Sequence, residues 1–203
     1  MIDALQTAAA FARLRAEPGT VAAMVMRSWA ALGVREDGGK NRGRWVDAII
    51  EMGGGDDEDA PAWCALACCA AWYTACHALG LHPRVVASGG VARLWQRQTV
   101  ETATLIPVSA VREGAALQAG DILIRGRDEA GARRIAAGQS AYGHAELVVR
   151  YAGGEWIHTA GGNTTGGDSA EGDGVYDKPR GHRVDDARIV GLVRPLVRTL
   201  VSA

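Results

Sequence analysis

The sequence lacks the features that mark several common classes of protein. Its charges nearly cancel, at a formal net charge of -1, which argues against a nucleic-acid-binding protein with a basic face. The first residues have no basic segment followed by an apolar one, so we expect no secretory signal. The longest apolar run, within residues 60–79, is too short for a membrane-spanning helix. We therefore expect a soluble protein made in the cytoplasm, without a nucleic-acid or membrane partner.

Cysteine is absent from most of the chain. The four cysteines, Cys64, Cys68, Cys69 and Cys76, lie within one predicted helix, where they are poorly placed to pair with each other. Their spacing, even with His77 added, is not that of a zinc site, because one helix cannot surround an ion with four ligands. We therefore expect no disulfide framework, no metal and no cofactor, and we interpret the last three cysteines as core residues.

The sequence does contain a pattern of helices followed by strands. A hydrophobic share of 48% over 203 residues is enough for one packed domain. Residues 1–19 are interpreted as an N-terminal helical extension and residues 20–203 as the main domain, with an α+β fold in which helices pack on an antiparallel sheet. The periodicity predicts helices at 3–16, 21–32, 44–52, 61–79 and 90–98, a polar connection at 126–141, and strands at 104–108, 119–125, 144–151, 155–160, near 174–178 and at 188–193.

One cysteine lies at a helix start. Pro61 is a signal for the first turn of a helix, and Gly80 ends the apolar run that follows. Cys64 therefore falls in the first turn, where unpaired N–H groups and the helix dipole favour a thiolate. A thiolate there is a competent nucleophile, whereas the alternative is a small buried core residue.

A histidine and an asparagine follow in a suggestive order. Gly143-His144 opens an apolar strand, and a second strand runs into Gly161-Gly162-Asn163. A cysteine on a helix N-terminus, then a histidine on a strand, then a polar residue after the next strand is the papain-like order of catalytic groups. A cysteine nucleophile needs such a base, and the base needs a third group to orient it.

These motifs together resemble a known family. Residues 61–65, 120–122, 143–144 and 162–164 resemble the CHAP-type cysteine amidases and peptidases, relatives of the NlpC-type enzymes within the papain-like fold. Residues 33–43 and 171–176 resemble the phage-associated branch of that family, so the resemblance spans roughly residues 20–195.

The resemblance implies a thiol-dependent peptidoglycan hydrolase, either an N-acetylmuramoyl-L-alanine amidase or a stem-peptide endopeptidase. The resemblance assigns Cys64 by position as the nucleophile, His144 as the general base and acid, and Asn163 as the residue that orients the histidine. The backbone N–H of Cys64 would help to stabilise the oxyanion. The expected partner is peptidoglycan or its stem peptide. The protein would act on the wall after export or lysis, as a phage or prophage endolysin or as an antibacterial effector with an immunity protein.

Two positions depart from the family. Members of this branch often carry Glu two positions before the asparagine, where this chain has Gly161, and a small residue two positions after the histidine, where it has Glu146. Since alternate residues of a strand share a face, we expect Glu146 on the same side as His144. Either Glu146 replaces the lost acid, or the site is impaired and the chain is a CHAP-like module that binds cell-wall fragments or serves as a phage structural component.

Other residues are candidates for substrate contact. Trp63 and Trp156 could line a groove for sugar or peptide, although core packing is the alternative. Asn41 and Arg42 are assigned to substrate binding, Arg42 as a partner for a stem-peptide carboxylate or else as a solvated charge. Glu146 completes this group.

The remaining histidines have weaker claims to the site. His158 is expected on the strand face opposite Asn163, in packing or at the surface. His77, His82 and His182 show no partner pattern and are interpreted as ordinary residues.

Overall fold

Helices come first in the chain and a sheet follows, as the sequence predicts. The computed structural model describes residues 17–55, 62–165 and 172–199. Its helices are α2 (Pro18–Ala31), α3 (Arg44–Met52), α4 (Cys64–Ala78), α5 (Val91–Gln96), α6 (Val108–Arg112) and α7 (Glu129–Ala136). Its strands are β1 (Leu81–Pro83), β2 (Ala103–Pro107), β3 (Ile122–Gly126), β4 (Gly143–Arg150), β5 (Trp156–Thr164), β6 (Gly174–Arg183), β7 (Ile189–Pro195) and β8 (Val197–Thr199).

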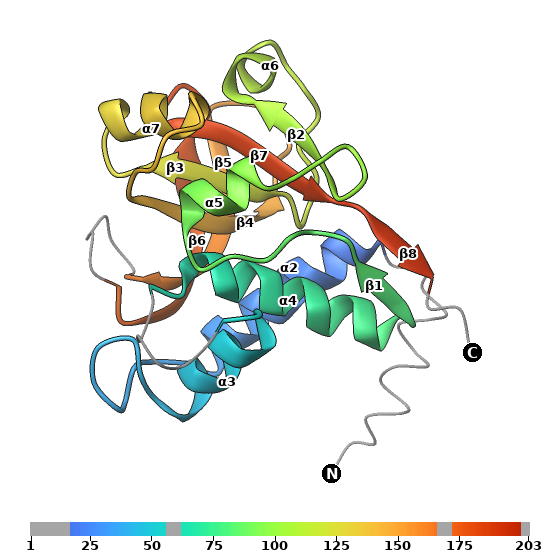
Figure 1. Cartoon of the computed structure of the whole chain (residues 1–203), viewed down its shortest axis with the longest axis vertical. Helices are drawn as coiled ribbons and strands as arrows, with labels where there is room; N and C mark the ends of the chain where they lie inside the picture. The colour runs from blue at the N-terminus through green and yellow to red at the C-terminus, as the bar shows by residue number, and fades with distance from the viewer. Residues whose placement is uncertain (1–16, 56–61, 166–171, 200–203) are drawn as a thin grey trace.

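The strands form one six-stranded antiparallel sheet in the order β2-β7-β3-β4-β5-β6, and β1 pairs with β8 separately. β2 is an edge strand, which suits Pro107 at its end, because proline cannot donate a hydrogen bond to a ladder. Figure 1 shows α2, α3 and α4 gathered along one side of this sheet. The fold is therefore α+β, with N-terminal helices packed against an antiparallel sheet.

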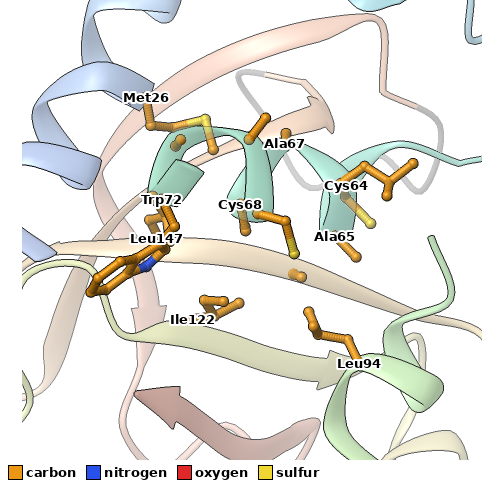
Figure 2. Packing of buried hydrophobic residues seen from close by; sticks show 14 of the residues in the cluster. Met26, Cys64, Ala65, Ala67, Cys68, Trp72, Leu94, Ile122 and Leu147 are labelled. Atoms are coloured by element: carbon orange, nitrogen blue, oxygen red, sulfur yellow. The ribbon is translucent and has the colours of Figure 1, made fainter. Parts of the chain in front are cut away.

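Helix α4 lies at the centre of the main core. It contacts α2 and α3 on one side and β4 and β5 on the other, so it is apolar around most of its circumference. In Figure 2, Cys68 and Trp72 point from α4 towards Ile122 and Leu147 of the sheet, and Met26 reaches the helix from α2. The abundance of alanine and cysteine in α4 lets these layers approach closely.

The N-terminus of α4 is fixed against β5 by a glycine. A Cβ atom on Gly162 would lie 2.4 Å from the Trp63 ring and 2.8 Å from the Ala67 Cβ atom, which is shorter than any real contact. The missing side chain therefore makes room for Trp63, the N-cap residue of α4. This packing holds the first turn of α4 beside the sheet.

The structure corrects several boundaries. The helix at 44–52 is confirmed, and the helix expected from 61 begins at Cys64 and ends before Gly80. The connection at 126–141 contains α7, which the sequence did not predict, and α6, β1 and β8 were also missed. The predicted helix at 3–16 lies outside the described residues. Among the helices of the described residues, none is long and apolar enough to cross a membrane.

Candidate active site

Cys64 is the first residue of α4 and is 4% exposed. Burial on its own would raise the pKa of the Cys64 thiol, but the charge and hydrogen bond of His144 and the backbone N–H groups of Ala145 and Ala65 outweigh it. The net result is a pKa below the ordinary value. The Cys64 thiol therefore ionises more readily than an ordinary thiol, because His144 stabilises the thiolate.

His144 on β4 faces both Cys64 and a carboxylate. Its Nε2 atom lies 3.1 Å from Glu146 Oε1, which leaves Nδ1 for the Cys64 thiol. Burial opposes the charged imidazolium, yet Cys64 and then Glu146 raise the pKa of His144 to about 9. The geometry and the two pKa directions together favour a thiolate–imidazolium pair near neutral pH.

Glu146 is 1% exposed and is surrounded by donors. Lys178 Nζ donates to Oε1 at 2.9 Å, Oε2 lies 2.7 Å from His182 Nε2, and the Thr159 hydroxyl also donates to Oε2. Burial would raise the pKa of Glu146, but the hydrogen bonds from His144 and His182 hold it well below the ordinary value. A buried carboxylate with this many donors stays ionised and fixes the ring it contacts.

The space for Glu146 comes from the neighbouring strand. A Cβ atom on Gly161 of β5 would lie 2.7 Å from Glu146 Cγ and 3.2 Å from its Cβ. The two positions therefore face each other across β4 and β5, and a larger residue at 161 would collide with the present glutamate. The two sequence departures are thus adjacent in space.

His182 belongs to this network, contrary to its interpretation as an ordinary residue. Burial lowers the pKa of His182, so its ring is neutral near pH 7 although it contacts Glu146. Arg125 Nη1 lies 3.4 Å from His182 Nε2, and Arg125 pairs with Asp186 at 3.0 Å. No sequence pattern indicates this role, because it depends on β6 extending to Arg183 rather than ending near 178.

Asn163 lies in the same cleft but contacts other partners. It and Asn41 are the two non-glycine residues of the described chain with a positive φ, 50° and 56°, and their amides meet at 3.2 Å. When both ends of the Asn163 amide are satisfied, Oδ1 accepts from the Trp63 N–H at 3.1 Å and Nδ2 donates to the Gly172 carbonyl at 3.2 Å. The hydrogen-bond partner of His144 Nε2 is therefore Glu146 rather than Asn163. Asn163 instead binds the backbone of Trp63, just before Cys64.

Two cavities meet at Cys64. One, of about 520 Å³, lies between α5, α7 and β4, and the other, of about 560 Å³, extends towards Asn41 and Asn163. Cys64, Tyr142 and Gly143 line both cavities, while His144 lines the second. Tyr142 is 84% exposed at this junction and was not predicted from the sequence. The Cys64 side chain therefore lies where two cavities adjoin.

Three predicted substrate contacts do not lie in this cleft. Trp63 is fully buried and its indole N–H donates to Glu36 at 3.0 Å, so the core-packing alternative is correct. Trp156 begins β5, seven residues from Asn163, or about 23 Å along an extended strand. Arg42 pairs with Asp47 at 3.7 Å and lines neither cavity.

Glu146 and Asn41, the other two residues assigned to substrate contact, have different surroundings. Glu146 lies beneath His144 and is too buried to touch a substrate. Asn41 does line the second cavity. In the described part of the chain no group of three or more histidine, cysteine and acidic residues is arranged to hold a metal ion.

Comparison of the chain with protein-family models, with curated proteins and with solved structures finds no match in any of the three.

Proposed function

We propose that this protein is a cysteine hydrolase of amide bonds with a papain-like, CHAP-type arrangement, acting on peptidoglycan. The observation that carries the proposal is the row of Cys64, His144 and Glu146 at the meeting point of two cavities. A nucleophile, its base and an orienter in mutual contact are the parts that acyl transfer requires. The order of motifs in the sequence points to the same family.

The chemistry follows from the positions of the protons. The Cys64 thiolate attacks the amide carbonyl, and N–H groups at the start of α4 stabilise the developing oxyanion. The His144 imidazolium then donates its proton to the leaving amine, and the C–N bond breaks to give a thioester. Neutral His144 next takes a proton from water, which attacks the thioester; the C–S bond breaks, the acid is released and the thiolate–imidazolium pair is restored.

Glu146 supports an active site over an impaired one. Its carboxylate holds Nε2 of His144 at 3.1 Å and stabilises the imidazolium, which is the role of the third catalytic group. Because Gly161 faces Glu146, we propose that the acid of the family has moved from β5 to the neighbouring strand β4. Catalytic function is then retained although position 161, where the family often carries glutamate, is a glycine.

Peptidoglycan is proposed on the strength of the sequence resemblance and of the open cleft. A cleft with a cavity on each side of the sulfur suits an amide that continues in both directions, as in a stem peptide or its link to muramic acid.

The test is digestion of purified peptidoglycan by the wild type and by Cys64→Ala, with the products identified by mass spectrometry. Cys76→Ala serves as a matched control, because Cys76 is buried further along α4 and lines neither cavity. We expect fragments from the wild type and the control but not from Cys64→Ala. The group that is freed, lactyl-muramic acid or a peptide amine, identifies the bond. Absence of fragments with several wall types would contradict the proposal and favour a cell-wall-binding module.

A further inference from the structure

The cavity between α5, α7 and β4 is lined by two positively charged side chains. Arg93 of α5 and Arg134 of α7 both line it, and among the described residues that line it none is acidic. In the described part of the chain, neither guanidinium makes an ion pair or a side-chain hydrogen bond. We call this cavity the arginine arm.

The second cavity differs in this respect. Its cations are largely paired within the protein, Lys178 with Glu146 at 2.9 Å and Arg125 with Asp186 at 3.0 Å. Glu36 and Asp173 also line it. The second cavity therefore combines charges of both signs, whereas the charged side chains that line the arginine arm, among the described residues, are both arginines.

The packing of the arm holds these charges close to the catalytic strand. A Cβ atom on Gly90 would lie 3.4 Å from Arg93 Nε, so the arginine side chain lies along the wall of the cavity. Gln96 of α5 donates to the Gln139 carbonyl just after α7 at 2.9 Å, which ties the two helices together. A Cβ atom on Gly143 would lie 3.0 Å from Val91 and 3.1 Å from Ile135, so both helices pack against the start of β4.

The rest of the arm leaves room for a substrate group. Its wall consists mainly of small residues, namely Gly89, Gly90, Ala92, Ser140, Ala141 and Gly143. Two guanidinium groups at the wall of a small, otherwise weakly polar cavity match a carboxylate, since arginine binds carboxylates through paired N–H donors.

We propose that the arginine arm is a subsite for a substrate carboxylate, so that the enzyme selects amide bonds with a free carboxylate on the adjoining residue. This inference rests on the proposed amide hydrolysis, and it narrows the substrate class to acidic peptides. Arg93 and Arg134 determine specificity and take no part in bond cleavage.

The first test measures charge at the site without any turnover. Cys64 is alkylated with iodoacetate and with iodoacetamide, which differ mainly in charge, and the ratio of the two rates is compared between variants. We expect Arg93→Gln/Arg134→Gln to lower the iodoacetate preference by about 3- to 10-fold relative to the wild type, because two nearby cations are removed. Arg133→Gln is the matched control, since Arg133 is on the same helix, pairs with Glu129 at 3.6 Å and does not line the cavity.

The second test uses two synthetic stem peptides that differ only in a free carboxylate or its carboxamide next to the scissile bond. We expect the wild type to favour the carboxylate by about 10-fold or more in kcat/KM, and the double variant to lose that preference. Cleavage of both peptides without a preference, or an alkylation ratio equal in all variants, would overturn the subsite. A ratio that falls in the double variant while neither peptide is cleaved would support the subsite and contradict the hydrolase.

Discussion

Cys64 in the first turn of α4 and Cys68 one turn further along are both buried, at 4% and 0% exposure, but their thiols differ in acidity. Burial and then the charges of Cys69, Cys64 and Glu146 raise the pKa of Cys68 well above the ordinary value. Burial also raises the pKa of Cys69 to about 12 and that of Cys76 to about 11. Cys64 alone among the four has a lowered pKa.

The difference shows that neither burial nor membership of this helix by itself lowers the pKa of a thiol. Figure 2 shows Cys68 pointing into the apolar space between α4 and the sheet. Cys64 instead contacts the His144 imidazolium, which outweighs the effect of burial. Removing His144 or the Glu146 carboxylate should therefore reduce the difference in acidity between Cys64 and Cys68.

Removing the histidine should abolish the difference. His144→Ala is expected to lower kcat/KM by about 10³-fold or more, because the thiolate loses its partner and the leaving amine its acid. At about pH 6, alkylation of Cys64 should fall to the rate of Cys68. His158→Ala is the control, since His158 pairs with Asp177 and lines neither cavity. Fast alkylation of Cys64 in His144→Ala would contradict the ion pair.

Neutralising the carboxylate should weaken the pair without removing it. Glu146→Gln is expected to reduce kcat by about 10²-fold, since the imidazolium loses its stabilising charge. In the wild type, activity should decline as pH rises through about 9, where His144 loses its proton. In the variant this decline should move to lower pH, because a carboxylate raises the pKa of a histidine and an amide does not.

Thr159→Val is the matched control for Glu146→Gln, since it removes one hydrogen bond to Glu146 but keeps the charge. Thermal unfolding should be measured for both, because the glutamine also leaves the Lys178 ammonium without a counter-charge. Unchanged turnover and an unchanged pH profile in Glu146→Gln would remove Glu146 from the mechanism.

Moving the acid back to β5 should restore part of the activity. Gly161→Glu alone is expected to be inactive, because its Cβ atom would lie 2.7 Å from Glu146 Cγ. Glu146→Ala alone is expected to be impaired by about 10²-fold for want of the carboxylate. The double variant Glu146→Ala/Gly161→Glu should recover about 10-fold over Glu146→Ala, measured as kcat/KM. No recovery in a folded double variant would argue against an exchange of the acid between strands.

The smallest effect is expected in the interior of α4. Cys68→Ala should lower the free energy of unfolding by about 1–2 kcal/mol through the small cavity it leaves. Its kcat should remain within about 2-fold of the wild type, since Cys68 faces the core. Denaturant unfolding and a turnover assay measure the two quantities. Loss of turnover in a variant of unchanged stability would show that the interior cysteine takes part in the chemistry.

Much of the fold follows from local patterns. Gly80, with a φ of 67°, ends α4 where expected, and the apolar spacing of α3 predicts its bounds. Helix α7 was missed because it is short and lies in a polar, glycine-containing segment with Ile135 as its one large buried side chain, and it is held by packing on β3 and β7.

The positions of Cys64, His144 and Glu146 were predictable in part from local signals. The helix-start signal before Cys64 predicts its position in the first turn. The alternation of side chains along a strand predicts that Glu146 and His144 lie on the same face. The contributions of Lys178 and His182 depend on the register of β5 with β6, which includes a shift between Ile157 and Thr159. Such a register is set by tertiary packing, so no local pattern reveals it. Trp63, the residue before Cys64, was wrongly predicted to contact substrate, because its packing against Gly162 buries it.

A Cys64 thiolate paired with His144 can be detected by following the alkylation rate of each cysteine against pH, with the modified peptides identified by mass spectrometry. We expect Cys64 to react at a constant high rate well below the ordinary thiol pKa of about 8.5, while Cys68, Cys69 and Cys76 remain unmodified. A Cys64 rate that rises only near the ordinary thiol pKa, in step with the other cysteines, would contradict this pairing.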